Sequence, residues 1–482
     1  MSLTCLDEFL KQLESVGDLL RIEAEVDPVL EIAEITRRVC RGGGTAIRFE
    51  RVRGHETSVV TNLLGTPERL ALALEIGSLD ELSTRLNGAA PRQGNWLQRI
   101  TSRPERDANY DPKTTKTARA QQIVHLGSDV DLGQLPCLLD WPQEASRNVT
   151  GLVVAQSRQT DQRTAATHRL SVVDAHRLSF CIAPYDPLWQ ILDEYRETRE
   201  KMPVAVPIGG PPVLALVGAC HPAREVDPWS LAGALQQAPM ELVTSRTHDV
   251  LVPATAELVI EGHIDPSEEN SPSPAQATSS GYCMPSRPSL TIQVSAVTHR
   301  TNYVLPARVI GPSPSDQSVL TVAVERIYWP LVQSVAEEIV DYALPSSGNG
   351  QVVFAAIRKT YPQQARKVAQ ALWGLDVLAR TKMIVVVDAT VDVHDDAAVW
   401  RQTAVNVDPS RDVTIGKGPG NYLDHAAVEP LCGGKLLLDA TAKLPGEQRH
   451  HWPELLDIDS TVRDLVDRRW SEYGLDDGTS PP

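Results

Sequence analysis

The pattern of apolar and polar residues divides the chain into three regions. In the first 118 residues an amphipathic stretch opens the chain, a short helix is expected over residues 31–40, and strands are expected over residues 46–52 and 57–64. Apolar positions that recur every three or four residues indicate a helix, whereas regular alternation with polar residues indicates a strand. Residues 1–118 are therefore predicted to form an N-terminal domain of mixed α and β structure.

The middle region, residues 119–312, is rich in short strand-like segments separated by glycine and proline. The expected strands lie at residues 151–157, 169–174, 177–183, 212–219, 257–262 and 290–298. This pattern favours a mostly antiparallel barrel. A stretch dense in serine, proline and acidic residues, 265–289, is expected to be a solvent-facing loop. A polar segment, roughly residues 93–118, is expected to connect the first region to the second.

From residue 313 to residue 482, amphipathic helices alternate with short apolar runs rich in β-branched residues. The expected helices lie at residues 318–332, 362–375 and around 395–403. The strands that follow them are expected at residues 351–357, 383–387 and 413–415. Apolar strands between amphipathic helices are typical of a parallel sheet covered by helices.

Length and charge narrow the class of protein. A chain of 482 residues is too long for one compact core, so two or three domains are expected. The formal net charge of -16 repels phosphate backbones and anionic lipid, which makes nucleic acids and membranes poor partners. No run of eighteen apolar residues occurs, and Asp7, Glu8 and Glu14 interrupt the segment that a signal peptide would need. We therefore expect a cytoplasmic protein.

The cysteines support the same compartment. Seven cysteines are scattered along the chain without a C-x-x-C pair. An odd count with wide spacing argues against a disulfide framework and against a zinc site. Inert thiols in a reducing compartment are the expected state.

Seven stretches resemble the UbiD family of non-oxidative decarboxylases, and their order and spacing span nearly the whole chain. They lie at residues 25–39, 59–74, 241–262, 324–345, 357–375, 405–413 and 436–447. The resemblance implies an N-terminal α/β domain (1–118), a central split β-barrel that binds flavin in the family (119–312) and a C-terminal α/β domain (313–482). Because the last domain usually makes the dimer in this family, a homodimer or a larger homo-oligomer is expected.

The resemblance also implies a chemistry. Members of the family use prenylated FMN, held through Mn²⁺ and K⁺, as the electron sink for loss of CO₂ from an unsaturated or aromatic acid. An Asn, a His and a Glu bind the metal, and an arginine and two acidic residues complete the site. The arginine orients carboxylates, and one of the acids donates a proton.

Most of these functional positions are changed here. The family's metal-binding Asn, His and Glu fall on Thr164, Pro187 and Pro228. Its two acids fall on Ser273 and Thr278, in a segment without any charge. Proline offers no side-chain ligand and a single hydroxyl cannot hold a divalent ion, so neither a metal site nor bound prenylated FMN is predicted.

Two residues of the family's N-x-G-x-Y-R motif remain as candidates for catalysis. Arg169 occupies the arginine position, and either orients an anion or forms a structural ion pair. His168 occupies the tyrosine position, where it is a competent acid, or it points away from the cavity because neighbours on a strand alternate. Asp186 and Asp227 precede the two prolines, and on strands a one-residue slip would need a bulge to turn either carboxylate into the site.

Three functions are compatible with this sequence. The first is an ordinary carboxy-lyase that uses prenylated FMN and Mn²⁺, with its acids and ligands supplied from other positions. The second is a cofactor-independent lyase for a small aromatic, unsaturated or β-keto acid that carries its own electron sink, with Arg169 and His168 as catalytic groups. The third is a non-catalytic partner subunit. We favour the second, because a retained arginine and an intact scaffold indicate a cavity still in use.

Overall fold

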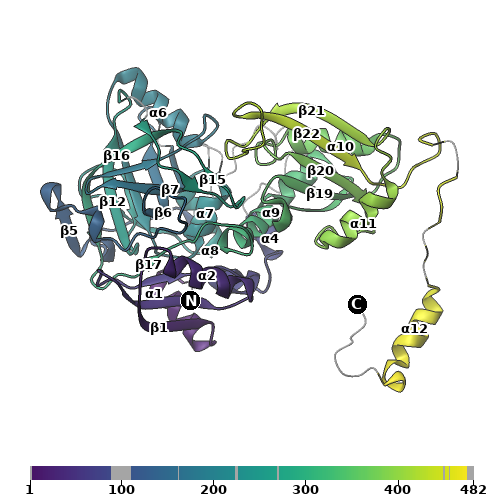
Figure 1. Cartoon of the computed structure of the whole chain (residues 1–482), viewed down its shortest axis with the longest axis horizontal. Coiled ribbons are helices and arrows are strands. Elements are labelled where there is room, and N and C mark those ends of the chain that lie inside the picture. Colours follow the sequence, from purple (N-terminus) through teal and green to yellow (C-terminus); the bar gives the residue numbers. More distant parts are fainter. Residues whose placement is uncertain are drawn as a thin grey trace.

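The computed structural model describes residues 3–87, 110–160, 162–222, 226–268, 271–448, 451–454, 456 and 458–474. Most of the expected polar connection at 93–118 lies outside these described residues. An N-terminal region and a barrel pack together on one side of the molecule, and a second α/β region lies beside them (Figure 1). The predicted mixed α/β architecture with a central antiparallel barrel is confirmed.

The N-terminal region is a small sheet covered by helices. Its strands, in the order in which they pair, are β1 (Leu19–Val26), β2 (Ala46–Val52), β3 (Val59–Thr61) and β17 (Leu305–Pro306). Its helices are α1 (Leu6–Ser15), α2 (Glu31–Arg41), α3 (Pro67–Leu74) and α4 (Glu81–Asn87). Helix α1 buries Phe9 and Leu13, which are four residues apart and so lie on one face. Strand β17 comes from the far end of the barrel region, so the two regions share one sheet.

The barrel is a closed ring of antiparallel strands. In pairing order these are β12 (Leu258–Ile264), β9 (Met202–Ile208), β6 (Asn148–Gln156), β7 (Arg163–Asp174), β8 (Arg177–Phe180) and β16 (Pro288–His299). Strand β12 also pairs with β16, which closes the ring. Strand β5 (Ile123–Leu126) adds to β16 outside the ring. In the long β6–β7 pair, Thr150 lies opposite Arg169 and Gly151 lies opposite His168.

Three helices and a small sheet surround the barrel. The helices are α6 (Pro187–Thr198), α7 (Val213–Cys220) and α8 (Pro228–Gln236). The small sheet is β11 (Leu251–Pro253), β10 (Glu241–Thr244) and β4 (Lys113–Thr114). The predicted strand at 212–219 is wrong, because this segment forms helix α7. Its apolar run lacks polar alternation, so periodicity could not distinguish a buried helix from a buried strand.

The stretch 265–289 also differs from its prediction as a solvent-facing loop. It forms three short strands, β13 (Ser271–Pro272), β14 (Gln276–Ala277) and β15 (Cys283–Met284). The side chains of Ala277 and Met284 are buried, and several other residues of the stretch line an internal cavity. Its acidic residues lie before residue 270, and the uncharged residues 271–286 that follow pack against β7 through the contacts of Gln276 with Ser171 and of Ala277 with Arg169.

The C-terminal region is a five-stranded sheet with helices on both sides. Its strands, in pairing order, are β18 (Ile339–Ala343), β19 (Val352–Ile357), β20 (Met383–Asp388), β22 (Cys432–Asp439) and β21 (Val413–Pro419). The central three strands are parallel, and β18 and β21 run antiparallel at the edges. The predicted parallel pairing is confirmed for β19 and β20, but the strand expected at residues 413–415 is the antiparallel edge strand β21, and the third parallel strand, β22, was not predicted. The helices are α9 (Asp316–Val335), α10 (Gln364–Trp373) and α11 (Asp396–Asn406).

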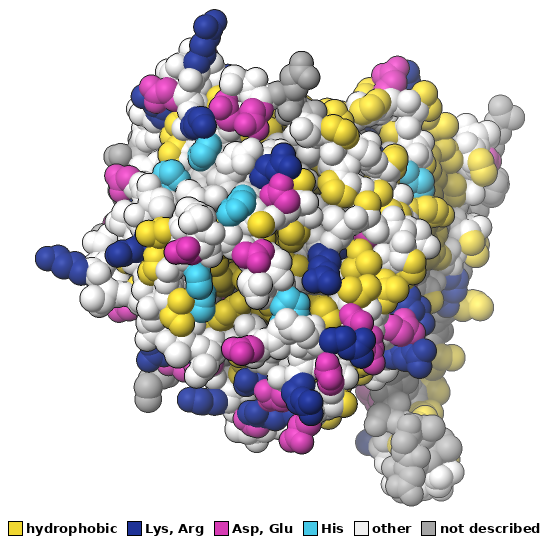
Figure 2. Space-filling view, turned by 60° about the vertical axis from the view of Figure 1, so that its left-hand side comes forward, with side chains coloured by type: hydrophobic (Ala, Val, Ile, Leu, Met, Phe, Trp, Pro, Cys, Tyr) yellow, Lys and Arg dark blue, Asp and Glu magenta, His cyan; other side chains and the backbone are white. Residues whose placement is uncertain are grey.

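The last helix, α12 (Ser460–Arg468), lies at the end of an extended segment and away from the rest of the chain (Figure 1). None of its residues is buried. Elsewhere on the surface, basic and acidic side chains are interspersed over the face that Figure 2 shows. No helix among the described residues is long and apolar enough to cross a membrane.

Candidate active site

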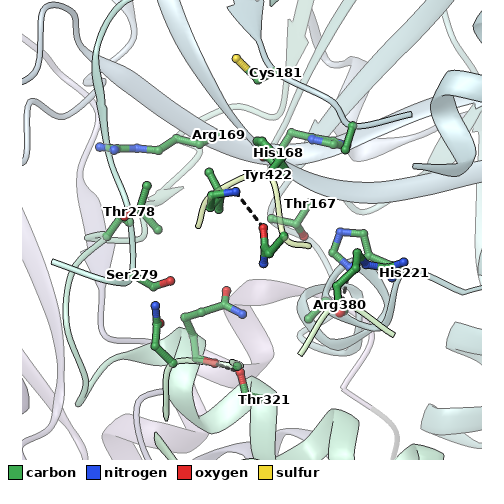
Figure 3. A pocket seen from close by; sticks show the side chains of 18 of the residues that line it. Thr167, His168, Arg169, Cys181, His221, Thr278, Ser279, Thr321, Arg380 and Tyr422 are labelled. Atoms are coloured by element: carbon green, nitrogen blue, oxygen red, sulfur yellow. Dashed lines mark hydrogen bonds between the residues drawn. The ribbon is translucent and has the colours of Figure 1, made fainter. Parts of the chain in front are cut away.

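A cavity of about 500 Å³ lies where the barrel meets the C-terminal region. One wall is formed by β7 and by residues 273–287 (Figure 3). The opposite wall is formed by the start of α9 and by loops at 345–350, 376–380 and 421–423. This size suits a small organic ligand, and a cleft between two regions of a chain is a common place for one. Both predicted catalytic residues, His168 and Arg169, line it.

Arg169 is held by two buried acids. Its Nη2 atom donates to Asp140 Oδ2 at 2.7 Å and to Glu144 Oε2 at 3.0 Å, and its Nη1 atom bonds the other Glu144 oxygen. Nη1 also donates to the Ala277 carbonyl at 3.2 Å. The acids are more deeply buried than the arginine, because their side chains are 1% and 0% exposed and that of Arg169 is 11% exposed. The guanidinium is therefore anchored in the wall.

The backbone completes this cluster. Glu144 also accepts a hydrogen bond from the Ala277 amide at 2.9 Å, and Asp140 accepts one from the Ile310 amide at 3.2 Å. Burial raises the pKa of Asp140 to about 6, although the charge of Arg169 opposes the shift. The cluster of Arg169, Asp140 and Glu144 therefore joins the segment before β6 to residues 276–277, which cover the cavity.

Sequence reasoning missed both acids. The family positions for acids, Ser273 and Thr278, do lie in the cavity wall, and both are buried. There, Ser273 Oγ accepts from the Arg287 amide, and Thr278 Oγ1 donates to the Tyr282 carbonyl. Carboxylates reach Arg169 from an earlier irregular segment, residues 140–144, and no spacing relative to the motif indicated it.

His168 lies on the other side of β7, against the start of α6. Its Nε2 atom is 3.6 Å from Asp186 Oδ2, and its ring meets the edge of Phe180 with centroids 5.1 Å apart. Burial lowers the pKa of His168; the Asp186 carboxylate opposes this and His221 adds to it. His168 and Arg169 both line the cavity although they are neighbours on β7. The imidazole is thus mostly neutral at pH 7.

The two prolines at the family's metal positions begin helices, not strands. Pro187 is the first residue of α6, and Asp186 caps that helix through a 2.9 Å hydrogen bond from the Leu188 amide. Proline at the first helical position after an aspartate cap is a favoured helix start. The expectation that Asp186 lies on a strand is therefore wrong, because it caps a helix. The second carboxylate oxygen of Asp186 faces His168.

The second proline has the same local structure. Pro228 begins α8, and Asp227 caps it by accepting the Ser230 amide at 2.9 Å. The other Asp227 oxygen lies 2.9 Å from Arg163 Nε. The Asp227 carboxylate, which a one-residue register slip would have offered to a metal, is therefore paired with the Arg163 guanidinium.

The residues at the family's ligand positions do not fit a divalent metal. Thr164 is buried in the β6–β7 pair opposite Ala155, and Pro187 and Pro228 have no ligand atoms in their side chains. In the part of the chain that the structure describes, no three His, Cys, Asp or Glu side chains are grouped to hold a metal ion. The phosphate clamp through Mn²⁺ that the resemblance implies has no donor set at these positions.

Comparison with known proteins places the chain in a family. Three sequence profiles of 3-octaprenyl-4-hydroxybenzoate carboxy-lyase match it: the N-terminal domain at residues 10–86, the Rift-related UbiD domain at 112–313 and the C-terminal domain at 318–440. A relative of uncharacterised function from Aquifex aeolicus is 35% identical, covering 98% of this chain and 99% of the relative. A second from Archaeoglobus fulgidus is 33% identical over 97% and 98%. The chain belongs to the UbiD family, as its motifs predicted.

Solved structures agree with this assignment. The closed form of vanillic acid decarboxylase from Sedimentibacter hydroxybenzoicus superposes with a TM-score of 0.87 at 24% identity, covering 98% of this chain and 99% of the other, and supports the fold. The UbiD-class enzyme HmfF from Pelotomaculum thermopropionicum, in complex with FMN, gives 0.80 at 26% identity over 95% and 98%. An evolved dimeric form of HmfF, in complex with prenylated FMN, gives 0.79 at 25% identity, also over 95% and 98%. The protein thus has the domains and fold of the UbiD-class decarboxylases.

Proposed function

We propose that this protein is a decarboxylase or related lyase for a small organic acid, and that it works without prenylated FMN. The observation that carries the proposal is a cavity still lined by His168, Asp186 and Arg169, while the metal positions hold Thr164 and two helix-starting prolines. The substrate class includes aromatic, unsaturated and β-keto acids.

Without a flavin, the electron sink must belong to the substrate. In a β-keto acid the bond between the carboxylate carbon and Cα breaks, CO₂ leaves, and the electron pair becomes an enolate. The fraction of His168 that is protonated then gives its proton to Cα, and solvent restores the proton. Asp186, 3.6 Å from the ring, stabilises the imidazolium, and Arg169 holds the acids Asp140 and Glu144 in the cavity wall.

A second function is favoured by a separate observation. Arg169 meets two acids, Asp140 and Glu144, although neither comes from the expected segment. An arginine with two acids is the combination that the family resemblance implies for flavin-dependent decarboxylation, and the HmfF structures contain FMN and prenylated FMN. A carboxy-lyase that uses prenylated FMN and Mn²⁺, with its metal ligands supplied from other positions, is therefore the alternative. A non-catalytic partner subunit is the third candidate.

The deciding experiment combines cofactor analysis with an activity screen. The protein is co-expressed with a flavin prenyltransferase, and its ultraviolet–visible spectrum and metal content are measured. Colourless, metal-free protein that releases CO₂ from a β-keto or hydroxyaryl acid supports the first proposal. Stoichiometric flavin with Mn²⁺ refutes it in favour of the alternative. Colourless protein without activity on a broad acid panel supports the partner subunit.

We also propose a cytoplasmic homo-oligomer that assembles through residues beyond 313. All seven cysteines are free in the structure, which suits a reducing compartment. The exposed helix α12 and apolar side chains of the C-terminal region, such as Ile415 (80% exposed) and Val405 (72%), offer surface for a second copy.

A further inference from the structure

Arg308 lies at a junction between two hollow spaces. It follows β17 in the segment that leads to α9, and it lines both the main cavity and an adjoining pocket of about 90 Å³. Thr150 of β6 and Thr167 of β7 line both spaces with it. A ligand in the main cavity therefore has access to a guanidinium and two hydroxyl groups at one place.

The donors of Arg308 are unused. Among the described residues, no hydrogen bond and no ion pair joins its guanidinium to another residue, although this group carries five N–H donors. The other arginines of the cavity wall differ. Arg169 is bound by two acids, Arg380 by Asp376 at 2.9 Å, and Arg287 by the Tyr422 carbonyl.

The acid that acts most on Arg308 is already engaged. Asp316 accepts a hydrogen bond from the Leu64 amide at 3.2 Å and also interacts electrostatically with Arg69. Burial lowers the pKa of Arg308, while Asp316 opposes the shift. Asp316 thus balances part of the charge of Arg308 without accepting any of its hydrogen bonds.

Arg308 is partly exposed and lines the cavity, so its free N–H donors are open to a ligand there. Thr150 and Thr167, also partly exposed, add two hydroxyl groups to the same wall. Neither hydroxyl makes a side-chain hydrogen bond to the rest of the described chain. Thr167 packs closely on α7, since a Cβ built on Gly218 would lie 2.1 Å from its Oγ1 atom. The three side chains form an acceptor-poor site that a small anion would complete.

We propose that Arg308, and not Arg169, binds the carboxylate of the cavity's ligand, with Thr150 and Thr167 as additional donors. This inference rests on the proposed function and assigns its binding group. A planar carboxylate matches the guanidinium in a bidentate arrangement, and its second oxygen also suits a hydroxyl donor. Arg169 then has a different task, which is to hold Asp140 and Glu144 in the wall.

The test uses the full-length protein and isothermal titration calorimetry at low salt. The probes are benzoate and acetoacetate, with benzamide as the uncharged control and inorganic phosphate as a competing anion. The variants are Arg308→Met and Arg308→Lys. Arg287→Met is the matched control, because it removes a cavity-wall arginine that already has a backbone acceptor. Thermal unfolding of each ligand-free protein is measured alongside.

Wild-type protein is expected to bind a carboxylate probe, and Arg308→Met to weaken that binding roughly 10- to 100-fold, the usual effect of losing charge-assisted hydrogen bonds. Arg308→Lys should recover part of the lost affinity, and Arg287→Met should bind the carboxylate probes as tightly as the wild type. The affinity for benzamide should be the same in all variants. The melting temperature of ligand-free Arg308→Met should change little, because Asp316 keeps the nearby charge of Arg69 and the hydrogen bond from the Leu64 amide. Removal of a residue with only a structural role would lower the melting temperature.

Each other outcome is decisive. Equal carboxylate affinity in wild type and Arg308→Met overturns this inference and leaves the proposed function standing. Wild-type protein that binds none of the carboxylates overturns the proposed function and the inference together. Phosphate binding that exceeds carboxylate binding, and that is lost in Arg308→Met, keeps the site but refutes the carboxylate assignment.

Discussion

Replacing Arg169 by alanine should test whether this residue serves catalysis or structure. The change removes the only basic partner among the described residues that the two buried carboxylates of Asp140 and Glu144 have. Breaking a buried ion pair by deleting one partner costs about 3–5 kcal/mol, because the remaining charge has neither solvent nor a counterion. For a unit the size of the barrel region, this predicts a melting temperature lower by roughly 6–20 °C.

The loss should depend on pH. The pKa of Asp140 is raised to about 6 even with Arg169 present, and removing the guanidinium should raise that pKa further. A carboxyl group with a raised pKa in the folded state favours folding below its ordinary pKa, and this contribution is lost as pH rises through the raised value. The destabilisation of Arg169→Ala should therefore be smaller at pH 5.5 than at pH 8.

The assays are thermal and chemical unfolding at both pH values, with turnover measured per folded molecule. The control combines Arg169→Met with Asp140→Asn and Glu144→Gln, which removes all three charges and should recover most of the stability. If Arg169 is catalytic, as the motif predicted, turnover in this folded control should fall roughly thirty- to a thousand-fold. A folded triple variant with unchanged turnover would leave the catalytic role without support. A single variant as stable at pH 8 as wild type would refute the ion-pair reasoning.

Three further outcomes are expected. His168→Gln should lower turnover about 10²–10⁴-fold and abolish the fall in the reaction rate as pH rises. In the wild type this fall should be centred below the ordinary histidine pKa, because burial lowers the pKa of His168. An unchanged pH profile in the variant counts against the proton-donor role. Glu257 is fully buried and its pKa is raised to about 7, so the free energy of unfolding of the wild type should fall between pH 5 and pH 8. Glu257→Gln should remove roughly 3 kcal/mol of that fall, measured by urea titration at each pH. An equal dependence of unfolding free energy on pH in both proteins would contradict this prediction. Deleting residues 455–482 should reduce the oligomer to a smaller species in light scattering, because Val462 and Leu465 of α12 are 47% and 44% exposed and need a covering surface; an unchanged mass refutes this.

Much of the scaffold was legible because its signals are local. Helix α1, the strands β2 and β19, and the alternation of the C-terminal region follow from periodicity within a dozen residues. The sequence alone also shows that residues 187 and 228 supply no side-chain ligand, since proline has none in any fold. The same local logic failed at 213–220, where an apolar run without alternation fits a buried strand and a buried helix equally well.

The contents of the cavity were decided by tertiary structure. Asp140 and Glu144 meet Arg169 because an irregular segment before β6 packs under the cover formed by residues 276–277. Nothing in sequence spacing encodes such a contact, since irregular segments have no fixed side-chain period. The sequence could not predict the unused N–H donors of Arg308 for a related reason. Whether an arginine has a hydrogen-bond acceptor depends on every neighbour in three dimensions, whereas the sequence shows only which residues adjoin it along the chain.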